Sequence, residues 1–392
     1  MHLCKVKKFI ATFAKNSNEM TAERDIAGFV LPFTLGVALT MAIHEVITDV
    51  PIYIRSISLL IVAACLYALL HQTANKLNTN TLWTIIISLG LCCGFLCCEG
   101  DYFNPTLAQT QDISILESAA DFGQKMRSII SSVPFEDSRT CSIATALITG
   151  DKSGLTTDTI NIFRKSGASH ILALSGMHLG IIYGLLKLIL WGLGSSRIAK
   201  FIKSGLTILI CGYYTLSTGA GPSIVRAFIF IMTAEIAQIT GRHTSLRTIL
   251  YSSLLIQLIL TPAEIRDVGF QLSYAAIAGI AYIFPKLRDL WPADKADRGL
   301  TIKGLKWIWD CSSLSIACQI TTAPIAFAYF GTFPKYFLIT NLLAIPLVTL
   351  IIPMGLLTVV LTGCGLCPGI IVSITEGLID ALVYCLSVIS SL

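Results

Sequence analysis

Charged residues are scarce in this chain. Asp, Glu, Lys and Arg make up only 13% of its 392 residues, whereas a soluble domain carries roughly a quarter. Hydrophobic residues account for 54%, and the mean hydropathy is +0.75. This composition excludes an ordinary soluble domain. Apolar runs of about 18–20 residues, each long enough to cross a bilayer core of about 30 Å, recur between Gly28 and Leu392. The sequence therefore predicts a polytopic membrane protein.

Sequence motifs of nucleotide-binding proteins and serine hydrolases are also missing. The chain has no G-x-x-x-x-G-K-[ST] loop for a nucleotide. It has no G-x-S-x-G around Ser175 either, because Ala173 and Met177 stand at the two glycine positions. Most of the thirteen cysteines lie in apolar runs, where Cys behaves as a small buried hydrophobe. One cluster of cysteines consists of Cys92, Cys93, Cys97 and Cys98. It lacks the His or carboxylate ligands that would accompany cysteines in a metal site. We expect no catalytic residue, no metal and no cofactor.

The apolar runs are continuous and do not alternate with polar residues. This favours helices over barrel strands, because a spanning segment has to satisfy its own backbone hydrogen bonds. We predict an all-α fold, a polytopic bundle of about 10–11 transmembrane helices. Pro346 and Pro353 interrupt one run, which predicts a broken helix or a re-entrant pair there. The predicted spans lie near residues 28–43, 52–70, 81–99, 169–193, 201–217, 224–240, 248–261, 269–285, 307–330, 337–362 and 369–390.

Lys and Arg cluster on alternate loops, which predicts the orientation of the bundle. With the N-terminus in the cytoplasm, the basic N-terminal tail, the loops after the fourth and sixth spans, and residues 286–306 all fall on the cytoplasmic side. The opposite loops, at 44–51, 218–223 and 331–336, hold only Lys335. Residues 1–27 are polar and basic without a cleavage site, so we expect the first span to be retained.

The long segment 100–168 then lies outside the membrane. Apolar residues recur in it at helical spacing with charged residues between them, and Pro134 ends the run. This predicts an amphipathic helix that lies on the outer membrane surface or caps the bundle from outside. Its apolar positions are Ile115, Leu116, Ala119, Phe122, Met126, Ile129, Ile130 and Val133. We divide the chain into an N-terminal membrane segment (1–99), an extracytoplasmic helix and opening motif (100–168), and a transmembrane channel domain (169–392).

Polar residues gather at the outer ends of several predicted helices. They either lie at the level of the lipid headgroups, as at many helix ends, or line a hydrated vestibule. His178, Arg226 and Gln271 lie about a turn or more inside, which favours the vestibule, because ionisable groups in spans usually face a protein interior or a water-filled path. The candidate residues of this outer mouth are Asp151, Lys152, His170, Ser175, His178, Arg226, Asp267, Gln271 and Asn341.

Glycines repeat every four residues in the fourth predicted span. Gly176, Gly180 and Gly184 predict a seam along which another helix packs closely. On this view Ser175 and His178 face elsewhere on the helix. Histidine is also a residue type of metal sites and proton relays, but no H-x-x-x-H pair or carboxylate set of suitable spacing accompanies His178.

Motifs in these same segments resemble a known family. The run from Ala144 to Leu155, continued from Phe163 to His178, is similar to the opening of the competence domain of ComEC/Rec2 proteins. Met177 replaces the leucine usual in the S-G-L-H motif of that family. Three later blocks resemble further motifs of the domain in the expected order, namely 219–226, 269–273 and 341–346. The resemblance extends from about residue 113 to the C-terminus.

The resemblance implies a channel in the bacterial cytoplasmic (inner) membrane that carries single-stranded DNA into the cell during natural transformation. A polar, partly cationic path suits such a polymer, and Arg226 offers a forked phosphate contact. The implied partners are single-stranded DNA, membrane lipid, and a separate nuclease, DNA receptor and cytoplasmic helicase or motor. Many members also carry an OB-like domain and a metallo-β-lactamase-like nuclease domain. This sequence has neither the length for the first nor the H-x-H-x-D-H motif of the second, so we expect a protein that is not an enzyme.

Two other functions remain open. A secondary transporter of a small polar or anionic solute would use a broken helix around Pro346 and Pro353, with Asn341 at an outer position. No inverted repeat of the kind common in such transporters is visible. A membrane scaffold would instead assemble a nuclease and a motor without conducting anything itself.

Overall fold

The computed structural model describes residues 113–240, 245–292, 299–331, 335–366 and 369–391, together with residues 23, 26–28, 30–31 and 33–38. The predicted spans 52–70 and 81–99, most of the predicted span 28–43 and the clustered cysteines lie outside the described residues. Every regular element in the described ranges is a helix, which confirms the all-α prediction. The chain divides into two compact units, one formed by Met1–Gln111 and Ile236–Tyr274, the other by Asp112–Glu235 and Ala275–Leu392.

Six helices within the described ranges are long and apolar enough to cross a membrane. They are Gly176–Leu193 (α8, Gly176–Ile189, with η3, Leu190–Leu193), Pro222–Ile239 (α10), Val268–Arg288 (α12, η5 and α13), Thr301–Phe330 (within α14, Gly299–Phe330), Phe337–Gly363 (α15) and Gly369–Ser390 (α16). Each coincides with a predicted span. Two other predicted spans are helices outside this set: α9 (Arg197–Ser217) begins with basic residues, and α11 (Leu246–Leu260) is shorter.

The first unit has few described elements. They are α11, η4 (Pro262–Arg266) and the first residues of α12 (Val268–Ala278), with fragments of the N-terminal segment. Phe33 packs with Leu258 and Phe270 in a small apolar cluster. Arg247 Nη1 lies 3.2 Å from Glu23 Oε1, so an ion pair also ties the N-terminal fragment to the start of α11.

The amphipathic helix predicted in segment 100–168 is α4 (Ile113–Ser132), which ends two residues before Pro134. It packs against α5 (Ser138–Thr149), α9 and α15, all in the second unit. Gly123 permits the contact with α9, because a Cβ at this position would overlap the carbonyl oxygen of Ser217. The residues that α4 buries are Ala119, Gly123, Met126 and Ile130, and Val133 just after the helix is buried as well. Its apolar face is therefore covered by other helices, which supports the interpretation that it caps the bundle.

Local capping and contacts with α16 determine where the short helices after α4 begin and end. The Asp137 side chain accepts the Arg139 N–H at 2.9 Å where α5 begins, and α5 ends at Gly150, whose φ of 79° favours glycine. Glu376 Oε1 on α16 accepts the backbone N–H groups of Glu136 and Asp137 at 3.0 and 3.2 Å. These bonds fix the start of α5, and with it the loop that follows α5.

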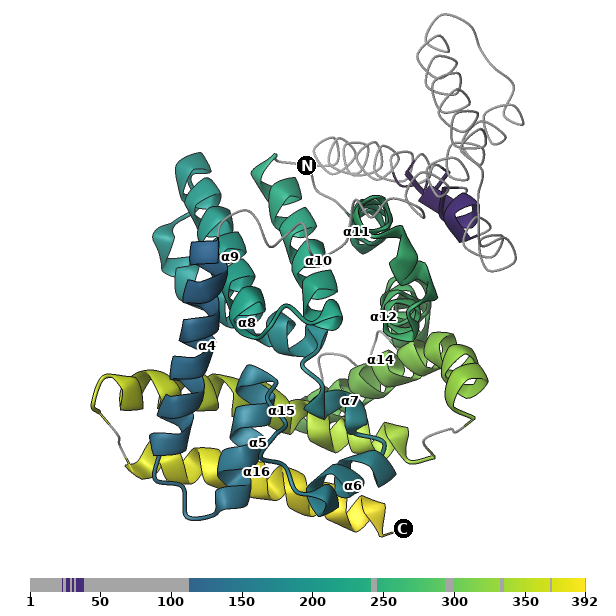
Figure 1. Cartoon of the computed structure of the whole chain (residues 1–392). Helices are drawn as coiled ribbons and strands as arrows, with labels where there is room; N and C mark the ends of the chain where they lie inside the picture. The colour runs from purple at the N-terminus through teal and green to yellow at the C-terminus, as the bar shows by residue number, and fades with distance from the viewer. Residues whose placement is uncertain are drawn as a thin grey trace, which may run out of the picture. The chain divides into compact units, whose positions relative to one another are not determined.

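The segment with two internal prolines is a single helix. Pro346 and Pro353 both lie inside α15, so neither a broken helix nor a re-entrant pair is present there. A proline removes one helical hydrogen bond and crowds the preceding turn, which neighbouring helices can offset. Figure 1 shows α16 beside α15, with α5 and α6 (Thr157–Lys165) against the pair, and α15 also contacts α4 and α8.

Candidate functional site

The first part of the candidate site is the start of α8. Ser175 has an extended backbone and precedes the helix. His178 is fully buried, and its Nδ1 accepts the Ser175 backbone N–H at 3.3 Å and lies 3.1 Å from Ser175 Oγ. Because a backbone amide only donates, Nδ1 must carry no proton, and the neutral ring has its proton on Nε2. The capping interaction therefore sets the tautomer of the imidazole.

The second nitrogen of this ring is a buried donor. His178 Nε2 has no hydrogen-bond partner among the described residues. A buried polar group without a partner costs roughly 1–3 kcal/mol, so native proteins keep few of them and many of these serve a function. The start of α8 thus presents an N–H that suits an acceptor such as a phosphate oxygen.

The second part of the site is the start of α10, which packs directly on the start of α8. A Cβ on Gly176 would lie 3.3 Å from the Cβ of Ala227. Arg226, the residue before Ala227, is buried with 5% of its surface exposed. The N-terminus of a helix carries a partial positive charge and favours anions. Each of the two helices thus carries a buried donor near its start, the imidazole N–H of His178 on α8 and the guanidinium of Arg226 on α10.

The predicted glycine seam is seen at one of its three positions. Gly176 makes the close approach to α10 just described. Gly180 and Gly184 are exposed, and no described atom lies within 4 Å of the place that a Cβ would occupy at either. Of the three glycines, Gly176 alone closely approaches a described atom of α10. Further along α8, the longer side chains of Tyr183 and Lys187 reach Glu235 of α10.

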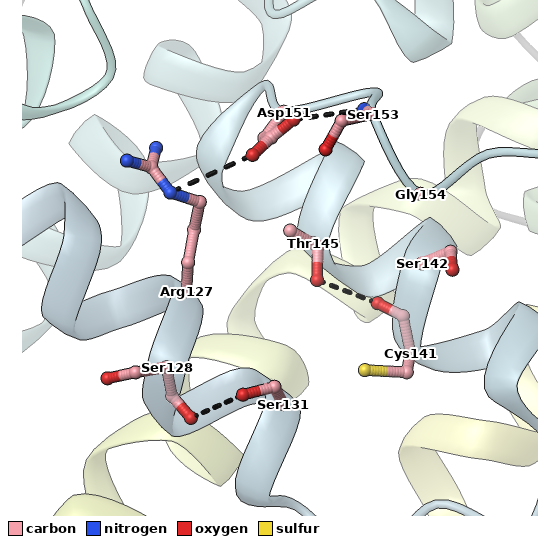
Figure 2. Close-up of a pocket in the computed structure, with 9 residues that line it drawn as sticks. All are labelled: Arg127, Ser128, Ser131, Cys141, Ser142, Thr145, Asp151, Ser153 and Gly154. Atoms are coloured by element: carbon pink, nitrogen blue, oxygen red, sulfur yellow. Dashed lines mark hydrogen bonds and ion pairs between the residues drawn. The ribbon is translucent and has the colours of Figure 1, made fainter.

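Asp151 lines a pocket of about 320 Å³ between α4, α5 and the loop after α5 (Figure 2). Arg127 Nε on α4 lies 3.7 Å from Asp151 Oδ2, and the Ser153 N–H donates to Oδ1 at 3.0 Å. The hydrogen bonds from Ser153, with the nearby Arg127 guanidinium, hold the pKa of the Asp151 carboxyl below its usual range. Gly154 closes the loop onto α5, since a Cβ there would lie 3.1 Å from Ser142 Oγ. Asp151 therefore ties this loop to α4.

The hydroxyl groups of this pocket are already used by their own helices. Ser128 Oγ donates to the Lys125 carbonyl at 2.8 Å, and Thr145 Oγ1 donates to the Cys141 carbonyl at 2.8 Å. Ser131 and Ser142 behave in the same way. Lys152, which was also predicted to line the outer mouth, is exposed and is not among the residues that line the pocket.

Asp151→Asn is expected to lower the thermal unfolding midpoint slightly at about pH 7 and not at about pH 2. The pKa of Asp151 is lower in the folded chain, so its ionised form stabilises the fold above the ordinary value of about 4. This stabilisation is lost as the pH falls through the lower folded value. The pair is about one third exposed, so the effect is at most about 1 kcal/mol. Unfolding midpoints of both proteins across this pH range test it, and a difference that stays constant with pH would contradict it.

Two more predicted residues lie in the same unit. His170 is exposed in the short helix α7 (Ser169–Leu172). Asn341 is half-buried on α15, and its Oδ1 has no hydrogen-bond partner among the described residues. The adjacent Thr340 donates to the Ser166 carbonyl at 2.6 Å, which fixes the start of α15 against the segment that leads into α7. Asn341 is thus placed near the approach to α8.

Asp267 and Gln271 belong to the first compact unit. Asp267 Oδ1 accepts the Phe270 N–H at 2.7 Å at the start of α12. Gln271 Nε2 donates to the Ile265 carbonyl at 2.9 Å. Both side chains therefore support the local turn. That they open onto the same vestibule as His178 and Arg226 stays a prediction.

The sequence motifs did not predict one further polar cluster. Glu235 on α10 is fully buried, and its Oε1 lies 2.6 Å from Lys187 Nζ on α8. Both residues stand inside apolar runs of spanning length, where any ionisable residue is a candidate for function. The scarcity of ionisable residues in spans therefore identifies both residues as candidates from the sequence. Because they are 48 positions apart, it does not predict that they pair.

Comparisons with known proteins place the chain in one family. A family model described as "Competence protein" matches residues 147–392. "ComE operon protein 3" of Bacillus subtilis (strain 168) is 27% identical over 214 residues, which are 54% of this chain and 25% of that protein. "Uncharacterized protein YcaI" of Escherichia coli (strain K12) is 24% identical over 213 residues, 52% of this chain and 26% of that protein. The chain thus matches about a quarter of the length of these relatives. No solved structure gives a significant match.

Proposed function

Because the chain belongs to the competence protein family, we propose that it is a membrane channel that carries single-stranded DNA across the cytoplasmic membrane during natural transformation. The multi-pass character rests on the helices long enough to span a membrane. The alternation of basic and neutral loops supports an N-terminus in the cytoplasm and the starts of α8 and α10 at the outer face. A separate nuclease, a DNA receptor and a cytoplasmic motor are the proposed partners.

The observation that carries the proposal is that α8 and α10, which approach each other at Gly176 and Ala227, each carry a buried donor near their start. His178 offers an Nε2–H and no acceptor in this tautomer, and Arg226 has only donors. Phosphate contacts supply most of the sequence-independent affinity for nucleic acid, and a guanidinium can hold a phosphate with two parallel hydrogen bonds. Donors of this kind recognise the backbone of a strand and ignore its bases. A channel that accepts any sequence needs this property.

The alternative of a secondary transporter has lost its main support. It drew on a broken helix around Pro346 and Pro353, and α15 is continuous through both. We therefore retain it only as an outcome that the test below can reveal.

The proposal is tested with the full chain in proteoliposomes. Fluorescent single-stranded oligonucleotides are added outside, external nuclease then removes whatever has not entered, and protected label is measured. Protected label above that of empty liposomes is expected, independent of base sequence. Duplexes of equal length serve as the control and should be excluded. Absence of protected label, together with counterflow of a small anion such as phosphate, would favour the transporter.

A further inference from the structure

A buried ion pair on α8 and α10 forms a second polar site. Lys187 Nζ lies 2.6 Å from Glu235 Oε1, and the Tyr183 hydroxyl donates to the same oxygen at 2.7 Å. The Lys187 ammonium also lies 5.4 Å from the centre of the Tyr183 ring. One carboxylate oxygen thus gathers two donors from α8, whereas Glu235 Oε2 has no hydrogen-bond partner among the described residues.

This cluster lies deep in the helices and away from the first site. At a rise of 1.5 Å per residue, Lys187 is about 16 Å along α8 and Glu235 about 20 Å along α10. Nine residues separate His178 from Lys187, and nine separate Arg226 from Glu235. Nine residues are about two and a half turns of a helix, so the members of each pair lie on opposite faces of their helix. The ion pair is therefore a distinct site.

The two charges differ in accessibility. The Lys187 side chain is 30% exposed, whereas that of Glu235 is 0% exposed. Any solute that reaches the pair meets the ammonium and not the carboxylate. An uncompensated charge within a spanning helix is costly, so a resident counter-ion allows Lys187 to remain charged there.

We propose that Lys187 binds a phosphate group and that Glu235 is its resident counter-ion, which the phosphate replaces. Lysine ammonium groups are common phosphate ligands. When Lys187 turns to the phosphate, the Tyr183 hydroxyl remains on the Glu235 carboxylate and keeps one of its oxygens hydrogen-bonded. The phosphate belongs to a nucleic-acid strand, so the inference rests on the proposed function, and binding of an anionic lipid headgroup is the competing outcome of the test.

The experiment measures phosphate binding by the full chain in nanodiscs of neutral lipid. One arm titrates a fluorescent oligothymidylate, and the other compares thermal unfolding midpoints with and without phosphatidylglycerol. Lys187→Met is expected to weaken binding about tenfold. Glu235→Gln is expected to tighten it several-fold, because the competing carboxylate is gone. Lys200→Met, at an exposed lysine of α9, is the matched control and should change binding less than about twofold.

A milder substitution keeps the inference testable even where Glu235→Gln does not fold. Tyr183→Phe keeps both charges and the ring but removes one hydroxyl from the carboxylate. The carboxylate then holds Lys187 more strongly, so binding is expected to weaken about two- to threefold. If Glu235→Gln fails to fold, the comparison of Tyr183→Phe and Lys187→Met with Lys200→Met decides the matter.

The direction in which each variant changes the affinity for each ligand distinguishes the outcomes. A response in the oligothymidylate arm that follows these signs supports the inference, and a response only with phosphatidylglycerol overturns it. If wild type binds the strand but the variants of the pair behave like Lys200→Met, the inference is overturned and the proposed function stands. A uniform loss of affinity in all three variants would mean that the pair only holds α8 to α10. If the wild-type chain responds to neither ligand, the inference is overturned. Its failure to bind the strand then also contradicts the proposed function.

Discussion

Arg226→Met is expected to reduce uptake of single-stranded DNA into proteoliposomes by about a hundredfold. Methionine fills a similar volume at this buried position but removes the charge and every donor. A forked contact with phosphate holds two charge-assisted hydrogen bonds, each worth about 1.5 kcal/mol or more. Their loss, about 3 kcal/mol, corresponds to the expected factor. The rate at which nuclease-protected label accumulates measures it.

The salt dependence of binding distinguishes a phosphate contact from a structural role. Loss of one phosphate contact should reduce the slope of log affinity against log salt concentration by about one. Arg226→Lys keeps the charge but loses the fork, so it should recover part of the uptake. Arg164→Met, at an exposed arginine of α6, is the matched control and should transport like wild type. An Arg226→Met protein with normal folding, an unchanged salt slope and near-normal uptake would falsify the role proposed for this residue.

Gly123→Ala is expected to destabilise the chain by about 1–2 kcal/mol, although alanine is the better helix former. Alanine in a helix interior gains about 1 kcal/mol over glycine. Against this, the new Cβ would overlap the Ser217 carbonyl oxygen, which is backbone and cannot rotate away. α4 would have to move off α9, and overpacking of this kind costs about 1–3 kcal/mol or more. The clash is the larger effect, so the thermal unfolding midpoint should fall by several degrees.

A second helical glycine provides the control. Gly377 lies within α16, and no described atom lies within 4 Å of the place that its Cβ would take. Gly377→Ala should therefore leave the midpoint unchanged or raise it slightly. Gly123→Val should lower it further than Gly123→Ala, because the branched side chain cannot be accommodated. A midpoint for Gly123→Ala at or above that of Gly377→Ala would show that α4 does not approach α9 as described.

Much of the candidate site could be placed from the sequence, and some of it could not. The pairing of Ser175 with His178 is local, because residues three apart lie one turn from each other at a helix start. The position of Arg226 near a helix start follows from Pro222, which suits the first turn. The partner of Asp151 was not predicted, because Arg127 comes from α4, on the other side of α5. Nor was the pairing of Lys187 with Glu235, whose helices are separated by the whole of α9.

The sequence by itself determined the membrane character, the all-α class, most helix positions within the described residues, and the family. These properties depend on composition, on runs of apolar residues and on caps, all of which act over a few turns of chain. Only the tertiary structure decided that α15 continues through Pro346 and Pro353, that Gly123 admits α9, and that Glu235 faces Lys187. Each of these depends on which helix faces meet and how closely. That is decided by packing and by the cost of burying polar groups over the whole bundle, which no local pattern contains.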